Sequence, residues 1–378
     1  MIISIFFAAL FLPGHLGDWW LERFFIIGIS LLGYMYLLVS KDKILKKTTL
    51  VLVFLVSFSS ILSVVCSPYF EVMTPTSLME LIRPFLLFGL FFWVGLNEKI
   101  RRPVNISIVS VVLLGWVFLT YLGYKYDIPL ISDVLKFLYG ETKTVVEGSW
   151  VRVSSPFENP NFLAFFLVLL FVVQVSYIKS SILGVVFTVF YMVAIYMTGS
   201  RTGWGAFLIV GFLIASYNIY AVTFMLASIL AVFLAIHFTQ YYTGMVRVDM
   251  AFDVIRYGLI EDQNFYGRLV QFQHALHQLS DSPLLGVGPF KGSQEFSIVD
   301  NQYFSYLLKW GVVGTLLYFF LIYRFFKEVA CERFNRFQMI FIVIMAIMLM
   351  SGAFLDNYRL FVLSIFMFAF LNEKKGGV

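Results

Sequence analysis

Apolar runs about as long as a membrane span recur along the whole of this 378-residue sequence, and they constrain its fold more than any other feature. A bilayer core of about 30 Å takes about 20 residues of helix to cross. Inside lipid only helices and closed barrels satisfy the backbone polar groups, and barrel strands would show short alternating segments instead. Charged residues make up 13% of the chain, about half the share of a typical soluble domain. The sequence therefore predicts an all-α, polytopic membrane protein.

The apolar runs predict a bundle of about twelve transmembrane helices, which form a single membrane domain over residues 1–378. The stretch 203–238 is divided in two, because a single helix of that length would measure about 54 Å. The shortest run, 1–12, is counted as the twelfth span. The other predicted spans are 24–39, 48–66, 78–96, 104–123, 160–178, 180–198, 203–216, 219–238, 302–323, 337–353 and 359–371.

Basic residues gather on one side of the predicted membrane, at 41–47, 99–102 and 324–336. The positive-inside rule assigns this side to the cytoplasm. Two long connections, 124–159 and 239–300, then lie on the outer side, and long ordered connections usually carry function. We therefore expect any chemistry at the outer face. The net charge of +5 follows from this orientation and predicts no nucleic-acid partner.

Arginines are scattered over the predicted outer half of the protein. The planar guanidinium suits bidentate binding of phosphate and stays charged at ordinary pH. For any single arginine, an ion pair or a lipid headgroup is the better explanation, as Glu80 and Arg83 at helical spacing illustrate. Together, however, they indicate an anionic, lipid-linked ligand. The set is Arg83, Arg152, Arg201, Arg247, Arg256, Arg268 and Arg359.

Two short polar motifs stand at the outer ends of predicted spans. Asn159 and Asn161 flank a proline, and an asparagine cap with proline in the first turn is a typical helix start. This explanation does not account for Arg152 just upstream. The second motif, 198–203, predicts a tight hairpin because Gly and Ser suit the turn. It would hold Arg201 near the headgroup level, where a lipid pyrophosphate would lie.

The second long connection contains a predicted amphipathic helix over 264–280, because its apolar residues recur at spacings of four and three. Arg268 flanks this apolar stripe, whereas His274 and His277 lie on the far side. If the stripe packs inward, the histidines face solvent, and we expect no metal site. The stripe consists of Phe265, Leu269, Phe272, Leu276 and Leu279.

A third polar motif, 300–303, leads directly into a predicted span. Asp300 could simply cap that helix. At helical spacing it also shares a face with Tyr303, Gly311 and Gly314, and the glycines permit close helix approach or leave room for a lipid or sugar. Asp300 would then lie over a groove, as a general base should. Residues 356–359 repeat the Asp-Asn pair at another outer helix start.

These motifs, taken together, resemble the O-antigen polymerase (Wzy-type) and O-antigen ligase superfamily, and they occur in the family's order between residues 150 and 315. In ligases the position of Asp300 is typically a histidine, so the aspartate favours a polymerase. The residues that carry the resemblance are Asn159, Pro160, Asn161, Ser200, Arg201, Thr202, Gly203, Arg268, Pro283, Gly286, Gly288, Asp300, Asn301, Tyr303, Gly311 and Gly314.

The resemblance implies glycosyl transfer at the periplasmic face of the bacterial inner membrane, without metal or cofactor. The donor would be an oligosaccharide on undecaprenyl pyrophosphate, with the lipid bilayer and a chain-length regulator protein as further candidate partners. We expect Arg201 and Arg268 to bind the pyrophosphate and Asp300 to act as base. The residues expected to assist in substrate binding are Arg152, Asn159, Asn161, Asn301, Tyr303 and Arg359.

Two alternatives remain beside the polymerase. One is an O-antigen ligase with lipid A-core as acceptor. The other is a transporter or flippase of lipid-linked sugars, which should carry charged residues through the interior of the bundle. Mid-span charges are few, chiefly Lys309 and Arg83, and the polar motifs gather at the outer rim. This distribution favours an outer-face enzyme.

Overall fold

The computed structural model shows a helical protein whose described residues fall into two compact units, unit 1 and unit 2. The predicted span 219–238 and most of 78–96 lie outside the described part of the chain. The described residues are 10–11, 27–28, 30–35, 43–72, 79–81, 85–86, 89, 106–139, 145–147, 150–157, 159–178, 181–215, 263–289, 301–330, 334–352 and 354–371.

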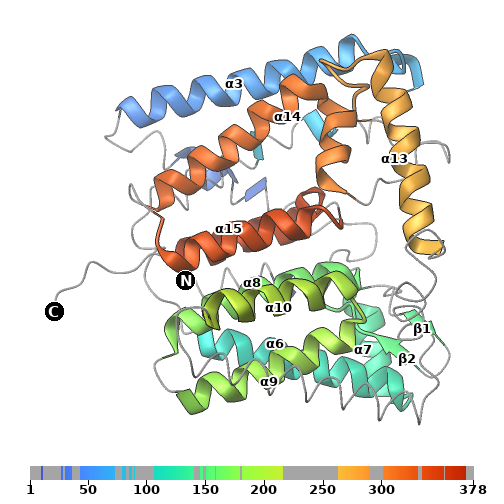
Figure 1. Ribbon diagram of the computed structural model, residues 1–378, viewed down its shortest axis with the longest axis vertical. Coiled ribbons are helices and arrows are strands. Elements are labelled where there is room, and N and C mark those ends of the chain that lie inside the picture. Colours follow the sequence, from blue (N-terminus) through green and yellow to red (C-terminus); the bar gives the residue numbers. More distant parts are fainter. Residues whose placement is uncertain are drawn as a thin grey trace. The chain divides into compact units, whose positions relative to one another are not determined.

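Unit 1 is built mainly from residues 103–265 and 336–348. Four of its helices, α6, α8, α9 and α10, pack side by side (Figure 1). A short antiparallel hairpin, in which Val146 faces Val151, packs its second strand against α6 and α9. The elements are α6 (Ile106–Lys125), α7 (Pro129–Tyr139), β1 (Val145–Glu147), β2 (Trp150–Arg152), α8 (Pro160–Tyr177), α9 (Ser181–Thr198), α10 (Arg201–Ala215) and α15 (Arg336–Leu349).

A buried polar network crosses the helices of unit 1. Ser110 Oγ on α6 donates to Gln174 Oε1 on α8 at 2.9 Å, and it lies 2.7 Å from the hydroxyl of Tyr191 on α9. Gln174 Nε2 donates in turn to Ser107 Oγ at 3.1 Å. Hydrogen bonds between apolar helices are a common source of helix association in membranes. The network therefore fixes the register of these three helices.

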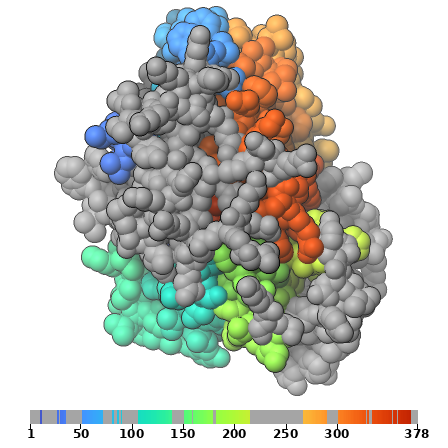
Figure 2. Space-filling view, turned by 90° about the vertical axis from the view of Figure 1, so that its left-hand side faces the viewer, coloured from blue at the N-terminus to red at the C-terminus, as the bar shows by residue number. Residues whose placement is uncertain are grey.

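Unit 2 is built mainly from residues 23–102, 266–335 and 349–378. Its two longest helices, α3 and α14, pack along each other, and Figure 2 shows α3 in blue against α14 in orange. A Cβ on Gly314 would lie 3.0 Å from Ser59 Oγ of α3, so this glycine permits the close helix approach. The elements are α3 (Lys43–Val65), η1 (Phe70–Val72), η2 (Met79–Leu81), α13 (Gln263–Asp281), α14 (Gln302–Val329), η4 (Phe354–Asp356) and α16 (Tyr358–Phe370).

Three described helices are long and apolar enough to cross a membrane: Ile106–Lys125, Pro160–Tyr177 and Gln302–Lys327. Five shorter apolar helices accompany them, and all eight lie within a few residues of predicted spans. The span predicted at 302–323 is not continuous, however, because α14 is broken at Gly311. The shorter apolar helices are Val51–Val65, Ile182–Thr198, Arg201–Ile214, Arg336–Leu349 and Arg359–Phe370.

Candidate functional site

The break in α14 is completed by a segment from elsewhere in unit 2. In a continuous helix the carbonyls of Leu308 and Lys309 would accept hydrogen bonds from the amides four residues later. The segment 282–288 supplies replacement partners for all four groups. These bonds run from Val287 N to Leu308 O (2.8 Å), from Gly288 N to Lys309 O (3.1 Å), from Val312 N to Pro283 O (3.0 Å) and from Val313 N to Leu284 O (3.2 Å).

Two glycines allow this backbone exchange. Gly311 has φ 64° and ψ −172°, a region that essentially only glycine occupies. A Cβ there would collide with the carbonyl of Leu284, and a Cβ on Gly286 would collide with the backbone of Gly311. The prediction of one helical face from Asp300 to Gly314 is therefore wrong. The chain direction changes at Gly311, which faces protein backbone and leaves no room for a sugar.

Ser63 of α3 and Ser67, two residues beyond the end of α3, brace the same place. Ser63 Oγ donates to the carbonyl of Lys309 at 2.6 Å, and Ser67 Oγ donates to the carbonyl of Val287. Lys309 O therefore accepts two hydrogen bonds, one from the segment 282–288 and one from α3. Non-helical backbone at membrane depth is tolerated where it is buried in protein or lines a cavity, and in transporters it marks binding sites. The break therefore marks this end of α14 as a candidate site.

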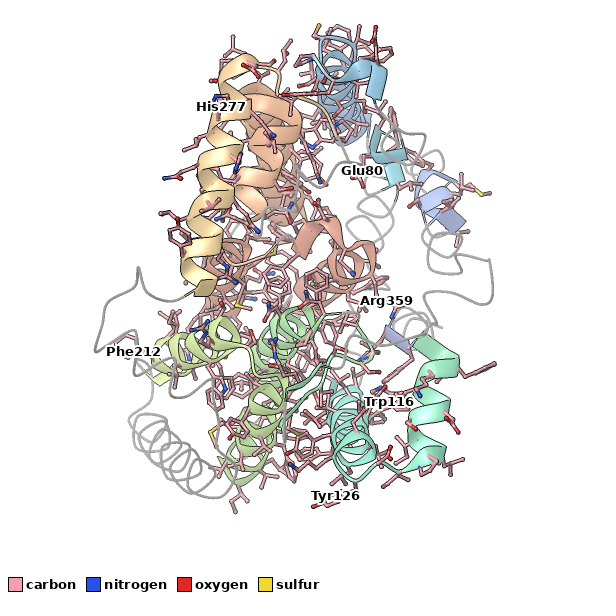
Figure 3. All side chains as sticks on the ribbon, turned by 90° about the vertical axis from the view of Figure 1, so that its right-hand side faces the viewer. Glu80, Trp116, Tyr126, Phe212, His277 and Arg359 are labelled. Carbon is pink, nitrogen blue, oxygen red and sulfur yellow. The ribbon has the colours of Figure 1, made fainter. Side chains whose placement is uncertain are left out.

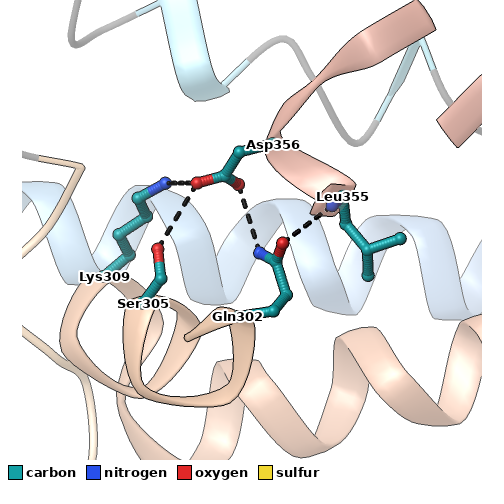
Figure 4. Close-up of polar contacts among 5 residues, drawn as sticks. All are labelled: Gln302, Ser305, Lys309, Leu355 and Asp356. Carbon is teal, nitrogen blue, oxygen red and sulfur yellow. Dashed lines mark hydrogen bonds and ion pairs between the residues drawn. The ribbon is translucent and has the colours of Figure 1, made fainter. Parts of the chain in front are cut away.

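The first half of α14, residues 302–310, carries a polar network that joins it to η4 (Figure 4). Lys309 Nζ donates to Asp356 Oδ2 at 2.6 Å, and Ser305 Oγ donates to the same oxygen at 3.4 Å. Gln302 Nε2 donates to the other carboxylate oxygen at 3.3 Å, while its Oε1 accepts from Leu355 N at 2.7 Å. The Lys309 and Asp356 side chains are only 12% and 20% exposed, so solvent screens this ion pair weakly.

Both Asp-Asn motifs use the asparagine to cap a helix. Asn301 Oδ1 accepts from the amides of Tyr303 (2.9 Å) and Phe304 (3.2 Å), and its Nδ2 donates to Met350 O at 3.0 Å. Asn357 Oδ1 likewise accepts from Leu360 N at 2.9 Å. Asn301 therefore holds the start of α14 in place. Its neighbour Asp300, the predicted base, lies outside the described residues.

The other predicted residues of unit 2 are partly or fully covered. Tyr303 is half-buried, with its ring 5.3 Å from that of Phe319. Arg359, in the first turn of α16, is 5% exposed (Figure 3). Arg268 on α13 is half-buried. At 100° per residue Arg268 shares its face with Phe272, so it belongs to the packed face of α13 and does not merely flank it.

The two histidines of α13 lie on its exposed side. His274 and His277 are both exposed, as the sequence predicted, and Figure 3 marks His277 on α13. Across the described part of the chain, no group of three or more His, Cys, Asp or Glu side chains could hold a metal ion. The polar network on the first half of α14 contains the carboxylate of Asp356, and this carboxylate is already paired with a lysine.

In unit 1, Arg152 supports the hairpin that precedes Arg201. Its side chain is 9% exposed, and Nε donates to Thr198 O at 3.1 Å. The adjacent amide of Val153 donates to Met197 O at 2.9 Å. Gly199 has φ 61°, and a Cβ there would lie 2.9 Å from Arg152 Nε. This packing explains an arginine that a simple helix start did not account for.

Arg201 itself is exposed at the first residue of α10. Ser200 Oγ accepts from Gly203 N at 3.1 Å, which is the geometry of an N-cap, and Thr198 Oγ1 accepts from Ser200 N at 3.2 Å. The hairpin thus presents the Arg201 guanidinium from a well-ordered helix start. The predicted tight turn at 198–203 is confirmed.

Of the two asparagines that the sequence offered as caps, Asn159 caps α8. Its Oδ1 accepts from Asn161 N at 2.8 Å, and Pro160 is the first helical residue. The predicted site residues thus divide between the two units. Arg152, Asn159, Asn161 and Arg201 belong to unit 1, and Arg268, Asn301, Tyr303 and Arg359 belong to unit 2.

Sequence reasoning missed the role of Asp356 as the acceptor at the centre of the unit 2 network. Two signals pointed toward it: Lys309 is a charge inside a predicted span, and Asp356 repeats the Asp-Asn motif. An intramembrane charge is expected to have a partner. Because the two residues are separated by 47 positions, their pairing could not be inferred from local spacing.

Part of the chain matches a known family model. Residues 183–319 match the family model described as O-antigen ligase. The matched range includes the 198–203 hairpin, Arg268, the segment 282–288 and the break at Gly311. No curated protein and no solved structure shows a significant match.

Proposed function

Residues 183–319 belong to the O-antigen ligase/polymerase superfamily, and from this premise we propose that the chain is a polymerase of lipid-linked oligosaccharide repeat units. The observation that carries the proposal is the coincidence of the matched range with the Arg201 hairpin and the broken α14. The aspartate at position 300, where ligases typically have histidine, supports polymerase over ligase. The product would be O-antigen or a related surface polysaccharide.

In this proposal the protein is a multi-pass protein of the bacterial inner membrane, with about twelve helices and its site at the periplasmic face. The polar helix starts at Asn159, Arg201, Asn301 and Asn357 support that placement, because the positive-inside rule puts them on the outer side. The donor is an oligosaccharide on undecaprenyl pyrophosphate, and neither metal nor cofactor takes part. A chain-length regulator protein is the proposed protein partner.

The reaction joins a sugar hydroxyl of the acceptor to the anomeric carbon of the donor. The new bond forms between that oxygen and carbon, the bond from the carbon to pyrophosphate breaks, and the hydroxyl proton passes to Asp300. A base must lie within about 2.6–3.2 Å of the proton donor in a productive pose. The leaving group is lipid pyrophosphate, so fixed positive charge in a partly dry site would stabilise it.

Arg201 and Arg268 supply that charge in the proposal. Arg201 is exposed on a capped helix start, and Arg268 is half-buried on α13. Arg152 and Asn301 act through other residues, since Arg152 holds the 198–200 hairpin and Asn301 holds the start of α14. Their contribution is to position Arg201 and Asp300. The other proposed substrate contacts are Asn159, Asn161, Tyr303 and Arg359.

The test replaces Arg201, Arg268 and Asp300 singly by alanine in the host and examines the surface polysaccharide on a gel. Loss of the long-chain ladder, with single capped repeat units retained, is the expected result. Lys327→Ala is a matched control, because Lys327 is an exposed cation at the other end of α14. Immunoblots of membranes show that each variant is present. An unchanged ladder in all three variants would contradict the site assignment.

The same variants distinguish the alternatives. An O-antigen ligase is the second candidate, favoured by the description of the matching family. Loss of all capped glycan would identify it. Accumulation of the lipid-linked unit on the cytoplasmic side would instead indicate a transporter or flippase.

A further inference from the structure

Helix α13 has an apolar edge that the described residues leave exposed. Its packed flank is centred on Phe272, whose ring stacks on that of Phe304 at 4.7 Å, and on Ala275, which is 4% exposed. The neighbouring edge carries Leu269 (40% exposed) and Leu276 (53%). Beyond it at helical spacing lie the exposed Ser280, Gln273 and Tyr266, so the apolar edge is narrow.

The opposite flank of α13 is polar. At 100° per residue, Gln271, His274 and Gln278 lie across the helix from Leu269 and Leu276. His274 is exposed to solvent. An apolar flank facing a polar flank is the pattern of helices that lie in the interface between membrane and water.

The direction of α13 agrees with that pattern. Within unit 2 it runs across the direction of α3 in Figures 1 and 3. Helix α3 is an apolar helix that packs along α14, one of the helices long enough to cross a membrane. A helix that crosses membrane-spanning helices in this way lies along the plane of the bilayer.

Exposed apolar side chains also occur directly after α13 and on the second half of α14. Directly after α13, Leu284 is 62% exposed, and its carbonyl accepts from the amide of Val313 on α14. Val313 and Leu316, on the second half of α14, are 42% and 65% exposed. Exposed apolar side chains on a membrane-spanning helix are covered by lipid.

We propose that the outer leaflet of the bilayer covers the Leu269–Leu276 edge of α13. The helix then lies in the headgroup region, with this edge toward the acyl chains and His274 toward water. This placement holds Arg268 at the depth of lipid phosphates. The use of Arg268 on a lipid pyrophosphate rests on the proposed function, whereas the lipid contact of the edge does not.

The test uses the full-length protein in phosphatidylcholine nanodiscs with single cysteines on the apolar edge and on the polar flank. The background carries Cys66→Ser and Cys331→Ser, since Cys66 is exposed and would also react. Leu269→Cys and Leu276→Cys probe the apolar edge, and His274→Cys is the control on the polar flank of the same helix. Each is labelled with an environment-sensitive fluorophore, then quenched by doxyl groups on the acyl chains or by iodide in water.

We expect several-fold stronger doxyl quenching at positions 269 and 276 than at position 274, and the reverse order for iodide. Equal quenching at all three positions would overturn the proposal. Disulfide formation between copies of the Leu276→Cys variant, together with exclusion of both quenchers, would also overturn it and assign the edge to a second copy. Because no activity is measured, failure here differs from failure of the proposed function, which the polysaccharide gel reports.

Discussion

Arg201 in unit 1 and Lys309 in unit 2 are both cations on apolar helices, but the backbone supports them in different ways. Arg201 stands at the exposed start of α10, and the hairpin before it joins two continuous helices. Lys309 lies inside α14, two residues before the break, and is paired with Asp356. A cation at a helix end reaches water directly. A cation within an apolar helix needs a counter-ion, because isolated charge in a membrane is costly.

The two units should therefore tolerate substitution differently. Around the 198–203 hairpin of unit 1 the polar residues stand at helix ends, whereas around α14 in unit 2 they belong to the interactions that complete a broken helix. Changes around α14 should cost more stability than changes around the 198–203 hairpin. The expected losses of unfolding free energy decrease from substitutions at the break in α14 to substitutions at the helix caps.

Gly311→Ala should have the largest effect, about 3 kcal/mol or more of unfolding free energy. The substitution adds strain in a region of φ and ψ that favours glycine, together with a collision with the Leu284 carbonyl. Gly205→Ala in α10 is the control, because a Cβ there meets no atom within 4 Å. It should stabilise by about 0.5–1 kcal/mol, as alanine is the better helix former. Thermal unfolding of the purified protein measures both, and equal shifts would contradict the comparison.

Asp356→Ala should cost about 2–4 kcal/mol, because it leaves the mostly buried Lys309 ammonium without its carboxylate. The double variant Lys309→Met, Asp356→Leu should lose less unfolding free energy than Lys309→Met and Asp356→Leu lose separately when their losses are added. We expect a coupling of about 1–3 kcal/mol between the two positions. Arg201→Ala, at an exposed position, should change stability by about 0.5 kcal/mol or less. All are measured by thermal unfolding. Additive effects in the Lys309–Asp356 cycle would show that the ion pair does not couple the two elements.

Gly199→Ala should cost about 1–2 kcal/mol, because an alanine in the left-handed region is strained. The added Cβ at position 199 would meet the side chain of Arg152, which can move away. The Cβ at position 311 would meet backbone atoms, which cannot. Arg152→Ala should therefore relieve part of the Gly199→Ala penalty. The unsubstituted protein, the two single variants and the double variant Arg152→Ala, Gly199→Ala are compared by thermal unfolding. A penalty as large as that of Gly311→Ala would remove the distinction between the two glycines.

Asn159→Ala should cost about 1 kcal/mol, the usual contribution of an N-cap, while Asn161→Ala should be close to neutral because its amide, not its side chain, makes the bond. Asn301→Ala in unit 2 should cost about 1 kcal/mol more than Asn159→Ala, since it also loses the bond to Met350 O. Thermal unfolding again measures the three variants. Equal losses at Asn159 and Asn301 would show that the Met350 contact contributes nothing.

The sequence alone determined most of the described helices, but it named Asp300, and not Asn301, as the possible cap of α14. The predicted spans 160–178 and 180–198 differ from α8 and α9 by one residue at an end. The turn at 198–203 was also predicted correctly, and the cap of α8 was predicted to be one of Asn159 and Asn161. These features depend on residues close together in the chain, namely a run of apolar side chains bounded by residues that satisfy the free amides of the first turn.

Only the tertiary structure decided where α14 breaks, what Lys309 pairs with and which flank of α13 is covered. The partners that replace two helical hydrogen bonds of α14 come from 282–288, and the carboxylate of Asp356 comes from 47 residues away. Spacing identified the apolar side chains of α13 but not that Leu276 stays exposed while Phe272 packs. Local spacing sets which residues share a helix face. Which face is covered, and where helical hydrogen bonds are exchanged, depends on groups that only folding brings near.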